Sequence, residues 1–306
     1  MRRCLSVLGV LALALAITGP ALAADQVKIG FITKFPVDFY FTLENAAKKY
    51  AAAHPDIELI TGQGQSATDV EGQIALIESM ISKGVQGIAI TPVDPSVASA
   101  LDKAVDAGIK VVLIDNDIPK WTRKTAVVAT DNYKGGTLAG QWLRTKLKDG
   151  DKIGILEGVP GVPALDDRVK GMMDGLGDRK VQVVGKVATN CTRELGVSGA
   201  EDILTANPGI AGIYAACGPP ALGAIQSIEN AKIAPDAILL VGFDALPEEV
   251  KEIIAGREDG SVAQFPAKMG ELGVETVLNA VRGEKVDANV DTGTAMVTQE
   301  NAKDFQ

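Results

Sequence analysis

Polar and aromatic side chains stand at the ends of short apolar runs in both halves of this sequence. In the first half they are Lys34, Phe35, Thr91, Asp115 and Asn116, and in the second half Val159, Cys191, Cys217, Phe243 and Asp244. Carboxylates and amides form paired hydrogen bonds with neighbouring hydroxyl groups, and aromatic rings stack on the apolar C–H face of a sugar. Brought together, these residue types would suit a neutral polyhydroxy ligand.

The groups that catalysis needs are missing from the sequence. The single histidine, His54, sits where a helix is expected to run into a turn, and no local motif pairs two carboxylates. The segment 62–67 matches a dinucleotide-binding pattern, but the next predicted strand ends at Thr91 without the acid that would bind the ribose. We therefore predict a glycine-rich turn there, and a protein that is not an enzyme and uses no cofactor or metal.

The first 23 residues have the pattern of a secretory signal. Arg2 and Arg3 precede an uncharged apolar run, Leu5–Ile17, and Ala21 and Ala23 are the small residues that a signal peptidase recognises. The run is shorter than the roughly 20 residues needed to span a bilayer. We expect cleavage after Ala23 and a soluble periplasmic protein.

The charge balance excludes one class of partner. The sequence has 30 basic and 39 acidic residues, a net charge of −9, and no basic patch, so we expect no binding to nucleic acid or to anionic membranes. Two cysteines, Cys191 and Cys217, follow the signal, and an even pair in an oxidising compartment favours a disulfide.

Continuous apolar runs alternate with amphipathic stretches along the chain, which is typical of parallel strands buried on both faces and joined by helices. Residues 27–115 and 152–244 each give four such units, and each series ends in an aspartate. We predict an α/β fold with two similar doubly wound parallel-sheet lobes, joined by crossover strands that form a hinge. The expected first lobe is 24–130 plus 265–291, and the second is 131–264 plus 292–306. Ligands of such sheets bind at the carboxyl ends of the strands.

Several motifs together resemble those of the ribose-binding-protein family, the periplasmic solute-binding proteins of sugar ABC transporters with the type 1 fold. They are the segments 111–116, 130–136, 204–208, 221–224 and 241–244, and the resemblance covers essentially all of the chain after the signal. The family implies a hinged protein that closes on its ligand and is then recognised by a membrane permease.

The resemblance also implies roles for individual residues. Phe39 and Tyr40 resemble the aromatic pair that sandwiches the sugar ring, and Asp115 resembles the principal carboxylate. The remaining positions carried over are Thr91 and Thr130 at the pocket or hinge, Arg168 as the arginine of the second lobe, Phe243 and Asp244 as its ring and carboxylate, and Gln264 on a crossover strand.

This sequence departs from the family pattern at several positions. Asn116 replaces an arginine, Cys191 an aromatic residue and Cys217 an asparagine, and Val37-Asp38 stands where an Asn-Pro pair precedes the aromatic residues. We interpret the two cysteines as one disulfide lining the pocket floor, with two separate thiols as the alternative. The departures favour a pentose or a polyol, whereas Lys34 raises the alternative of an acidic sugar.

The expected partners are a small sugar or polyol and a membrane permease, with a chemoreceptor as a further candidate, and the protein itself is expected to be a monomer. A sensor subunit that signals to a histidine kinase is the main alternative, because it would use the same lobes. A transcription regulator would need a DNA-binding module at the N-terminus, where this chain has the predicted signal.

Overall fold

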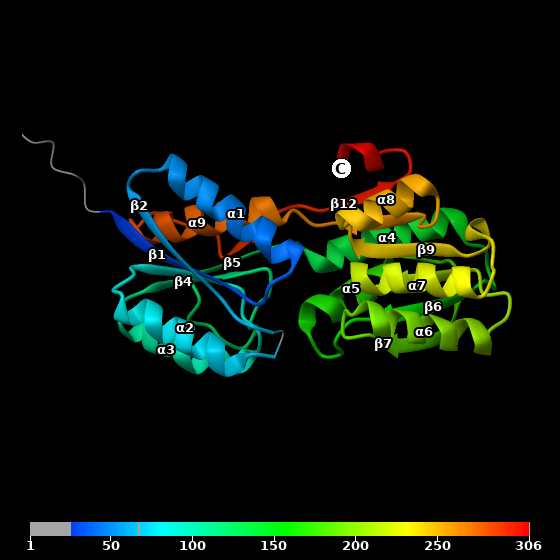
Figure 1. The fold of residues 1–306 in the computed structure, drawn as a ribbon, viewed down its shortest axis with the longest axis horizontal. Coiled ribbons are helices and arrows are strands. Elements are labelled where there is room, and N and C mark those ends of the chain that lie inside the picture. The colour runs from blue at the N-terminus through cyan, green and yellow to red at the C-terminus, as the bar shows by residue number, and fades with distance from the viewer. Residues whose placement is uncertain (1–25, 67, 306) are drawn as a thin grey trace, which may run out of the picture.

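The computed structural model describes residues 26–66 and 68–305, which fold into two α/β lobes lying side by side (Figure 1). The predicted signal and its cleavage site lie outside these residues. Each lobe contains one six-stranded sheet with helices on both faces. Within the described ranges, no helix is both long and apolar enough to cross a membrane.

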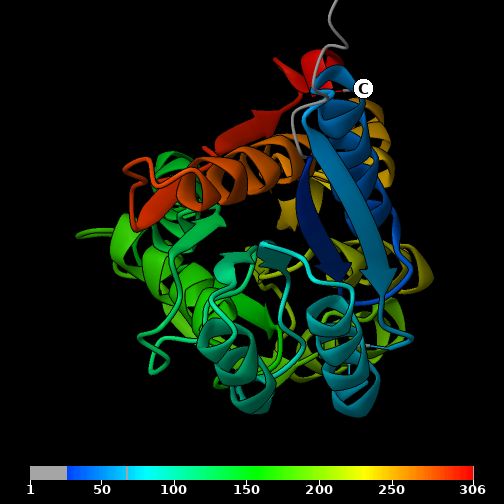
Figure 2. The ribbon, with the colours of Figure 1, turned by 90° about the vertical axis from the view of Figure 1, so that its left-hand side faces the viewer.

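The sheet of the first lobe is parallel throughout, in the order β11-β5-β4-β3-β1-β2. Its strands are β1 (Val27–Thr33), β2 (Ile57–Gln63), β3 (Gly87–Ile90), β4 (Lys110–Ile114), β5 (Ala126–Ala129) and β11 (Asn289–Asp291). Helices α1 (Asp38–Ala53) and α9 (Pro266–Val281) cover one face, and α2 (Val70–Ser82) and α3 (Ala98–Asp106) cover the other (Figure 2).

The second lobe repeats this plan in the order β12-β10-β9-β8-β6-β7. Its strands are β6 (Lys152–Glu157), β7 (Gln182–Ala188), β8 (Gly212–Ala215), β9 (Leu239–Asp244), β10 (Gly260–Ala263) and β12 (Ala295–Thr298). Helices α4 (Asn132–Lys146) and α5 (Pro163–Gly175) cover one face, α6 (Arg193–Ala206) and α7 (Gly218–Asn230) cover the other, and α8 (Pro247–Ala255) packs beside β10. Short 3-10 turns occupy Pro95–Val97, Pro235–Ala237 and Ala302–Phe305.

Strand β4 shows why continuous apolar runs in the sequence predicted strands that are buried on both faces of the sheet. Val112 and Ile114 pack toward α1 and α9, while Val111 and Leu113 pack toward α2 and α3. Because both faces of the strand are buried, both sets of alternating side chains are apolar. After its first residue, the exposed Lys110, the strand is entirely apolar, and the residue that follows it is Asp115.

The chain crosses between the sheets three times, after β5, after β10 and after β11. The crossings are bonded to one another. The hydroxyls of Thr130 and Thr292 lie 3.5 Å apart, and the Thr294 hydroxyl donates to the Ala263 carbonyl over 2.8 Å. Three adjacent connections of this kind form the hinge geometry that the sequence predicted.

Two short strands were not expected from the sequence. β11 has three residues and β12 has four, too few to show a clear hydrophobic period. Strand β12 also pairs antiparallel to β10, so the second sheet is not parallel throughout. The strand expected at 261–265 instead spans Gly260–Ala263, because the chain leaves the sheet at Gln264 to cross to the first lobe.

Candidate functional site

The two sheets place an aspartate at the carboxyl end of equivalent strands. Asp115 follows β4, and Asp244 ends β9, which occupies the same position in the second sheet. Both have a positive φ, 64° for Asp115 and 110° for Asp244, a region that non-glycine residues rarely adopt. The charges of Asp244 and Arg168 act on the pKa of Asp115, so these groups of the two lobes are close in space.

In the first lobe, Asp115 Oδ2 accepts hydrogen bonds from the Tyr40 hydroxyl (3.0 Å) and from Asn116 Nδ2 (2.7 Å). Its other oxygen, Oδ1, has no hydrogen-bond donor among the described residues. Burial raises the pKa of the Asp115 carboxyl, while the positive charges of Lys34 and Arg168 and the Tyr40 bond oppose this shift. The Asp115 side chain is thus fixed in orientation by hydrogen bonds to one oxygen, while its other oxygen can still accept a hydrogen bond from a ligand.

The tyrosine that bonds this carboxylate belongs to a cluster of three aromatic residues. Phe35 and Phe39 each meet the Tyr40 ring edge-on, with ring centroids 5.3 Å apart. Tyr40 is buried in the core, and its burial, together with Asp115, raises the pKa of its phenol well above its usual value. Phe35 and Phe39 are only partly buried, so these two rings, rather than Tyr40, present apolar surface.

Lys34 follows β1 beside the same carboxylate and is half-buried. Its ammonium group forms no ion pair with any described residue. Burial lowers the pKa of Lys34, although the charge of Asp115 partly opposes the shift. The neighbouring backbone is fixed by Gln63, whose Nε2 donates to the Thr33 hydroxyl and to the Phe35 carbonyl, both over 3.2 Å.

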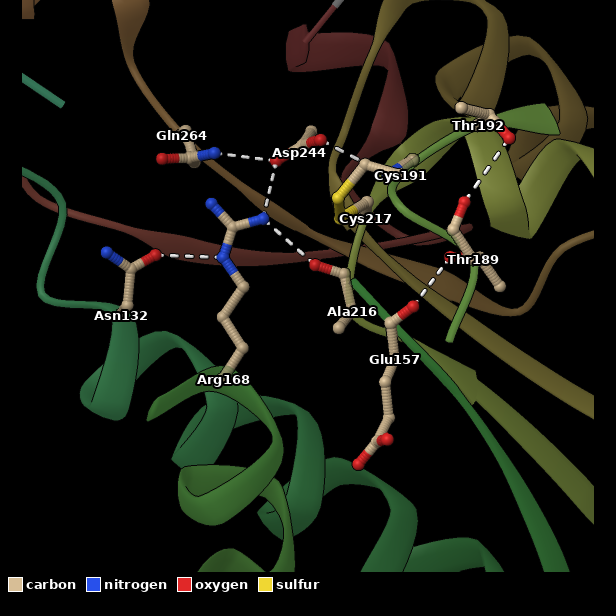
Figure 3. Close-up of a disulfide and its surroundings, with 11 residues drawn as sticks. Asn132, Glu157, Arg168, Thr189, Cys191, Thr192, Ala216, Cys217, Asp244 and Gln264 are labelled. Carbon is tan, nitrogen blue, oxygen red and sulfur yellow. Dashed lines mark hydrogen bonds and ion pairs between the residues drawn. A yellow bond between two sulfur atoms is a disulfide. The ribbon is translucent and has the colours of Figure 1, made fainter. Parts of the chain in front are cut away.

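In the second lobe, Arg168 is the centre of a hydrogen-bonded network (Figure 3). Its Nη1 donates to Asp244 Oδ1 (3.1 Å) and to the Ala216 carbonyl (2.9 Å), and its Nε donates to Asn132 Oδ1 (2.8 Å). Gln264 Nε2 also donates to Asp244 Oδ1, over 2.6 Å. Nη2 of the guanidinium has no acceptor among the described residues and remains available to a ligand.

Close helix packing helps to place this arginine. A Cβ at Gly136 of α4 would lie 2.1 Å from the Arg168 carbonyl oxygen, and one at Gly171 of α5 would lie 2.1 Å from the Tyr133 carbonyl oxygen. Only glycine permits the two backbones to approach in this way. The backbone of Arg168 on α5 is therefore packed closely against α4, which fixes the position from which its side chain extends.

Phe243 does not lie where a ligand could stack on it. Its side chain is fully buried in the core, and the Arg168 guanidinium carbon lies 3.9 Å from its ring centroid. In this structure the ring therefore supports the arginine by a cation–π contact. The alternation of a strand explains the difference, because Phe243 and Asp244 point to opposite faces of β9.

Two buried polar atoms at the strand ends have no hydrogen-bond partner among the described residues. They are the Thr91 hydroxyl oxygen and Gln264 Oε1. A buried polar atom without a hydrogen bond costs about 1–3 kcal/mol. Together with Asp115 Oδ1 and Arg168 Nη2, they provide acceptors and donors from both lobes for a polar ligand.

The other predicted site residues have separate locations. Thr130 lies in the hinge next to Thr292, and Val159 is exposed in the loop after β6. Cys191 and Cys217 form the expected disulfide, with Cα atoms 5.5 Å apart, at the ends of β7 and β8. The predictions that these residues contact a ligand stay untested.

Sequence reasoning missed three supporting residues. Asn132 orients Arg168, although it lies within a motif that carried the family resemblance. Gln73, fully buried on α2, holds the turn that contains Thr91. Glu249 on α8 lies behind Asp244, and neither Gln73 nor Glu249 differs in the sequence from an ordinary polar residue of an amphipathic helix.

Glu249 belongs to a buried carboxyl pair. Its oxygens accept from the Leu246 N–H (2.7 Å) and the Ser261 hydroxyl (2.8 Å), which fixes the turn after Asp244. Burial, with the charge of Asp244 as the next cause, raises the pKa of Glu249 to about 8. The pKa of neighbouring Glu258 is also raised, first by burial and then by Glu249. Within the described ranges, no cluster of three or more histidine, cysteine or acidic residues could hold a metal.

Comparison with known proteins gives consistent matches. Residues 29–285 match the family model described as a periplasmic binding protein domain. A D-ribose/D-allose-binding protein of Pseudomonas aeruginosa is 32% identical over 272 residues, covering 85% of each chain. A ribose import binding protein of Bacillus subtilis is 31% identical, covering 85% of this chain and 83% of its own.

Solved structures are similar over nearly the whole chain. A periplasmic solute-binding protein of an ABC transporter from Actinobacillus succinogenes, with bound D-allose, has a TM-score of 0.85 at 26% identity and covers 91% of this chain and 100% of its own. A solute-binding protein from Bacillus halodurans with bound myo-inositol has a TM-score of 0.84 at 26% identity, covering 92% of this chain and 98% of its own.

Proposed function

Because this chain belongs to the periplasmic binding protein family, we propose that it is the substrate-binding subunit of an ABC importer and binds a monosaccharide or sugar alcohol between its lobes. The family consists of solute-binding proteins of the periplasm, not of enzymes. We further propose that the signal is cleaved after Ala23 and that the mature protein is a monomer.

One observation carries the choice of ligand. Four side chains each have a polar atom without a partner among the described residues, and they come from the strand ends and hinge of both lobes: Thr91, Asp115, Arg168 and Gln264. Phe35 and Phe39 add apolar ring surface beside Tyr40, which bonds Asp115. Hydroxyl groups both donate and accept, so a polyhydroxy compound can satisfy such a mixed set.

The mechanism that we propose is closure about the hinge. A ligand that bonds Asp115 in the first lobe and Arg168 in the second stabilises the arrangement in which both are near it. Hydrogen bonds to charged groups contribute about 1.5–3 kcal/mol each, so a few of them hold the lobes together. A permease that recognises the closed arrangement then receives only loaded protein.

The charges near the site favour a neutral ligand. Lys34 and Arg168 are balanced by Asp115 and Asp244, and Arg168 already pairs with Asp244. The unpaired ammonium of Lys34 supports an acidic sugar as the alternative. Structural relatives include proteins solved with D-arabinose and glycerol as well as with D-allose and myo-inositol, which supports a monosaccharide or polyol for this chain.

The first test is thermal unfolding of the protein with D-ribose, D-allose, D-arabinose, myo-inositol, glycerol and a series of polyols and sugar acids. A ligand that binds only the folded state raises the melting temperature by mass action. We expect a shift with one small class of neutral compounds, which the Asp115→Ala variant loses. A shift only with sugar acids would favour the alternative, and no shift with any compound would contradict the sugar proposal.

Coupling to a chemoreceptor or a histidine kinase remains a second use of the same closed state. Importer and sensor are distinguished by uptake. Deleting the gene should abolish import of the bound compound if the protein serves a permease. Intact uptake with a lost transcriptional or chemotactic response would favour the sensor.

A further inference from the structure

Two turns occupy equivalent places at the ligand-facing ends of the two sheets. One follows β3 and the other follows β8, the third strand from the β2 or β7 edge in each sheet. The N–H groups of Thr91 and Ala216 donate to the carbonyls of Ile32 and Leu156, both over 2.9 Å. Residues 91–93 therefore correspond to residues 216–218.

In the first lobe, one buried amide binds this turn from both sides. Gln73 Nε2 donates to the Thr91 carbonyl, and Gln73 Oε1 accepts from the Val93 N–H, each over 2.9 Å. Gln73 is fully buried and serves no other partner. The middle residue is Pro92, whose ring restricts φ.

In the second lobe, the ligand-facing ion pair binds the same two backbone groups. Arg168 Nη1 donates to the Ala216 carbonyl (2.9 Å), and Asp244 Oδ2 accepts from the Gly218 N–H (3.2 Å). The middle residue here is Cys217, bonded to Cys191 (Figure 3). The disulfide thus lies between the two backbone groups that orient the pair.

The other end of the disulfide is anchored as well. The Thr189 hydroxyl donates to the Glu157 carbonyl of β6 over 2.6 Å, and the Thr192 hydroxyl donates to the Thr189 carbonyl over 3.2 Å. Thr192 also caps helix α6 by accepting from the Leu195 N–H. Cys191 therefore ties the turn to a segment that is fixed to both a strand and a helix.

We infer that the Cys191–Cys217 disulfide is a positioning device for the Arg168–Asp244 pair. By fixing Cys217 it holds the Ala216 carbonyl and the Gly218 N–H in the places that orient the guanidinium and the carboxylate. The first lobe has no disulfide at the equivalent turn, because the buried Gln73 amide, which does not face a ligand, bonds both backbone groups of that turn. In the second lobe the Arg168–Asp244 pair that binds the turn also faces the ligand. The disulfide therefore fixes the turn independently of that pair. The part of this inference that concerns affinity rests on the proposed function.

A test without ligand is amide hydrogen exchange, followed by NMR, in the Cys191→Ser/Cys217→Ser variant. We expect protection of the Gly218 N–H to fall about tenfold or more, as a hydrogen bond to a charged group is weakened. Val93 in the first lobe and Ala211, whose N–H donates to the Lys152 carbonyl at the start of β8, are the controls and should change little. Unchanged protection at Gly218, or an equal fall at Ala211, would overturn the inference.

A test with ligand uses the compound of the thermal screen that gives the largest shift with oxidised protein, measured by calorimetry. We expect the double serine variant to bind it about tenfold more weakly, with a smaller further loss when Asp244→Asn is already present. Equal affinities, or equal losses in both backgrounds, contradict the inference. If no compound in the screen binds oxidised wild-type protein, the proposed function fails, and hydrogen exchange alone decides the inference.

Reduction of the wild-type protein covers the case in which the serine variant does not fold. Dithiothreitol transfers two electrons and two protons to the disulfide, giving two thiols and its own cyclic disulfide. Affinity and Gly218 protection should fall on reduction and return after reoxidation with oxidised glutathione. A reduced protein that remains folded and keeps both properties would overturn the inference.

Discussion

The aspartates at the ends of β4 and β9 occupy equivalent positions but have different surroundings. Asp244 is bonded on both oxygens, to Arg168, Gln264 and the Gly218 N–H. Asp115 receives neutral donors on one oxygen only, and its other oxygen has no donor among the described residues. The second-lobe carboxylate is thus tied into its own lobe with an arginine, whereas the first-lobe carboxylate keeps one oxygen able to accept a further hydrogen bond. Two equivalent residues of a duplicated fold therefore differ in how completely the protein itself satisfies them.

Breaking the charged pair should have the largest effect. Arg168→Met leaves the partly buried Asp244 without its cation and the Ala216 carbonyl without its donor, so we expect the free energy of unfolding to fall by about 3 kcal/mol. Urea denaturation measures this. The double variant Arg168→Met/Asp244→Leu should lose clearly less, because no buried charge remains. Equal losses in the two variants would show that the pair itself is not responsible.

The carboxyl pair behind Asp244 should make stability depend on pH. The pKa of Glu249 is about 8 in the folded protein, above its ordinary value of 4.5, so unfolding releases its proton between these pH values. The contribution of Glu249 to stability is therefore complete below about pH 4.5 and should fall by up to about 1.4 kcal/mol per pH unit as the pH rises toward 8. Denaturation at pH 5, 6, 7 and 8 measures the slope.

Glu249→Gln is the matched variant for that measurement. It keeps an acceptor for the Leu246 N–H but removes the titrating proton, so its slope should be shallower than that of the wild type. The raised pKa of Asp115 gives a slope of the same sign, so Asp115→Asn provides the first-lobe counterpart. An unchanged slope in Glu249→Gln would place the pH dependence elsewhere.

Asp115→Asn separates binding from stability. Burial disfavours the charged form of Asp115, so removing the charge should leave the free energy of unfolding unchanged or slightly raised. Affinity for the sugar found in the thermal screen should fall about tenfold to a hundredfold, since a charged acceptor is lost. Calorimetry and urea denaturation of the same preparation test both parts. A strong destabilisation would mean that the two aspartates do not differ as described.

The smallest effect is expected from Tyr40→Phe. The ring and its packing against Phe35 and Phe39 stay, and only the hydrogen bond to Asp115 is lost. We expect about 1 kcal/mol in stability or about a fivefold loss of affinity. Asn116→Ala, which removes the other donor to the same oxygen, is the comparison. If neither change alters affinity, the orientation of Asp115 does not depend on these donors.

Much of the site could be located from the sequence because it lies where strands end. Asp115 and Asp244 each terminate an apolar run, and parallel strands bring such ends to one edge of a sheet. The contents of each site were harder to predict. Tyr40 and Phe243 were expected to face the ligand, yet Tyr40 is buried and bonds Asp115 through its hydroxyl, and Phe243 lies beneath Arg168. The residue type indicates which contacts a side chain is able to make. The face of the helix or strand on which the residue lies decides which of those contacts it makes in the folded protein.

The residues that support the site could hardly be recognised in the sequence. Gln73 and Glu249 look like ordinary polar residues on amphipathic helices, but Gln73 clamps a turn 18 residues away and Glu249 lies against β9 and β10. The glycines that admit Glu249 are Gly218 and Gly242, where a Cβ would come within 2.2 and 2.4 Å of its oxygens. These complementary positions are recognisable only when the elements are packed together.

The sequence by itself determined the alternation of strands and helices, the duplication of the lobe and the positions at which polar groups end the strands. These properties follow from local hydrophobic patterns, which are readable along the chain. Only the packed structure shows that Arg168 pairs with Asp244, that Tyr40 bonds Asp115 and that Cys217 lies between the two backbone groups that bond this ion pair. Such contacts join residues dozens of positions apart, and their geometry depends on how closely helices and sheets pack.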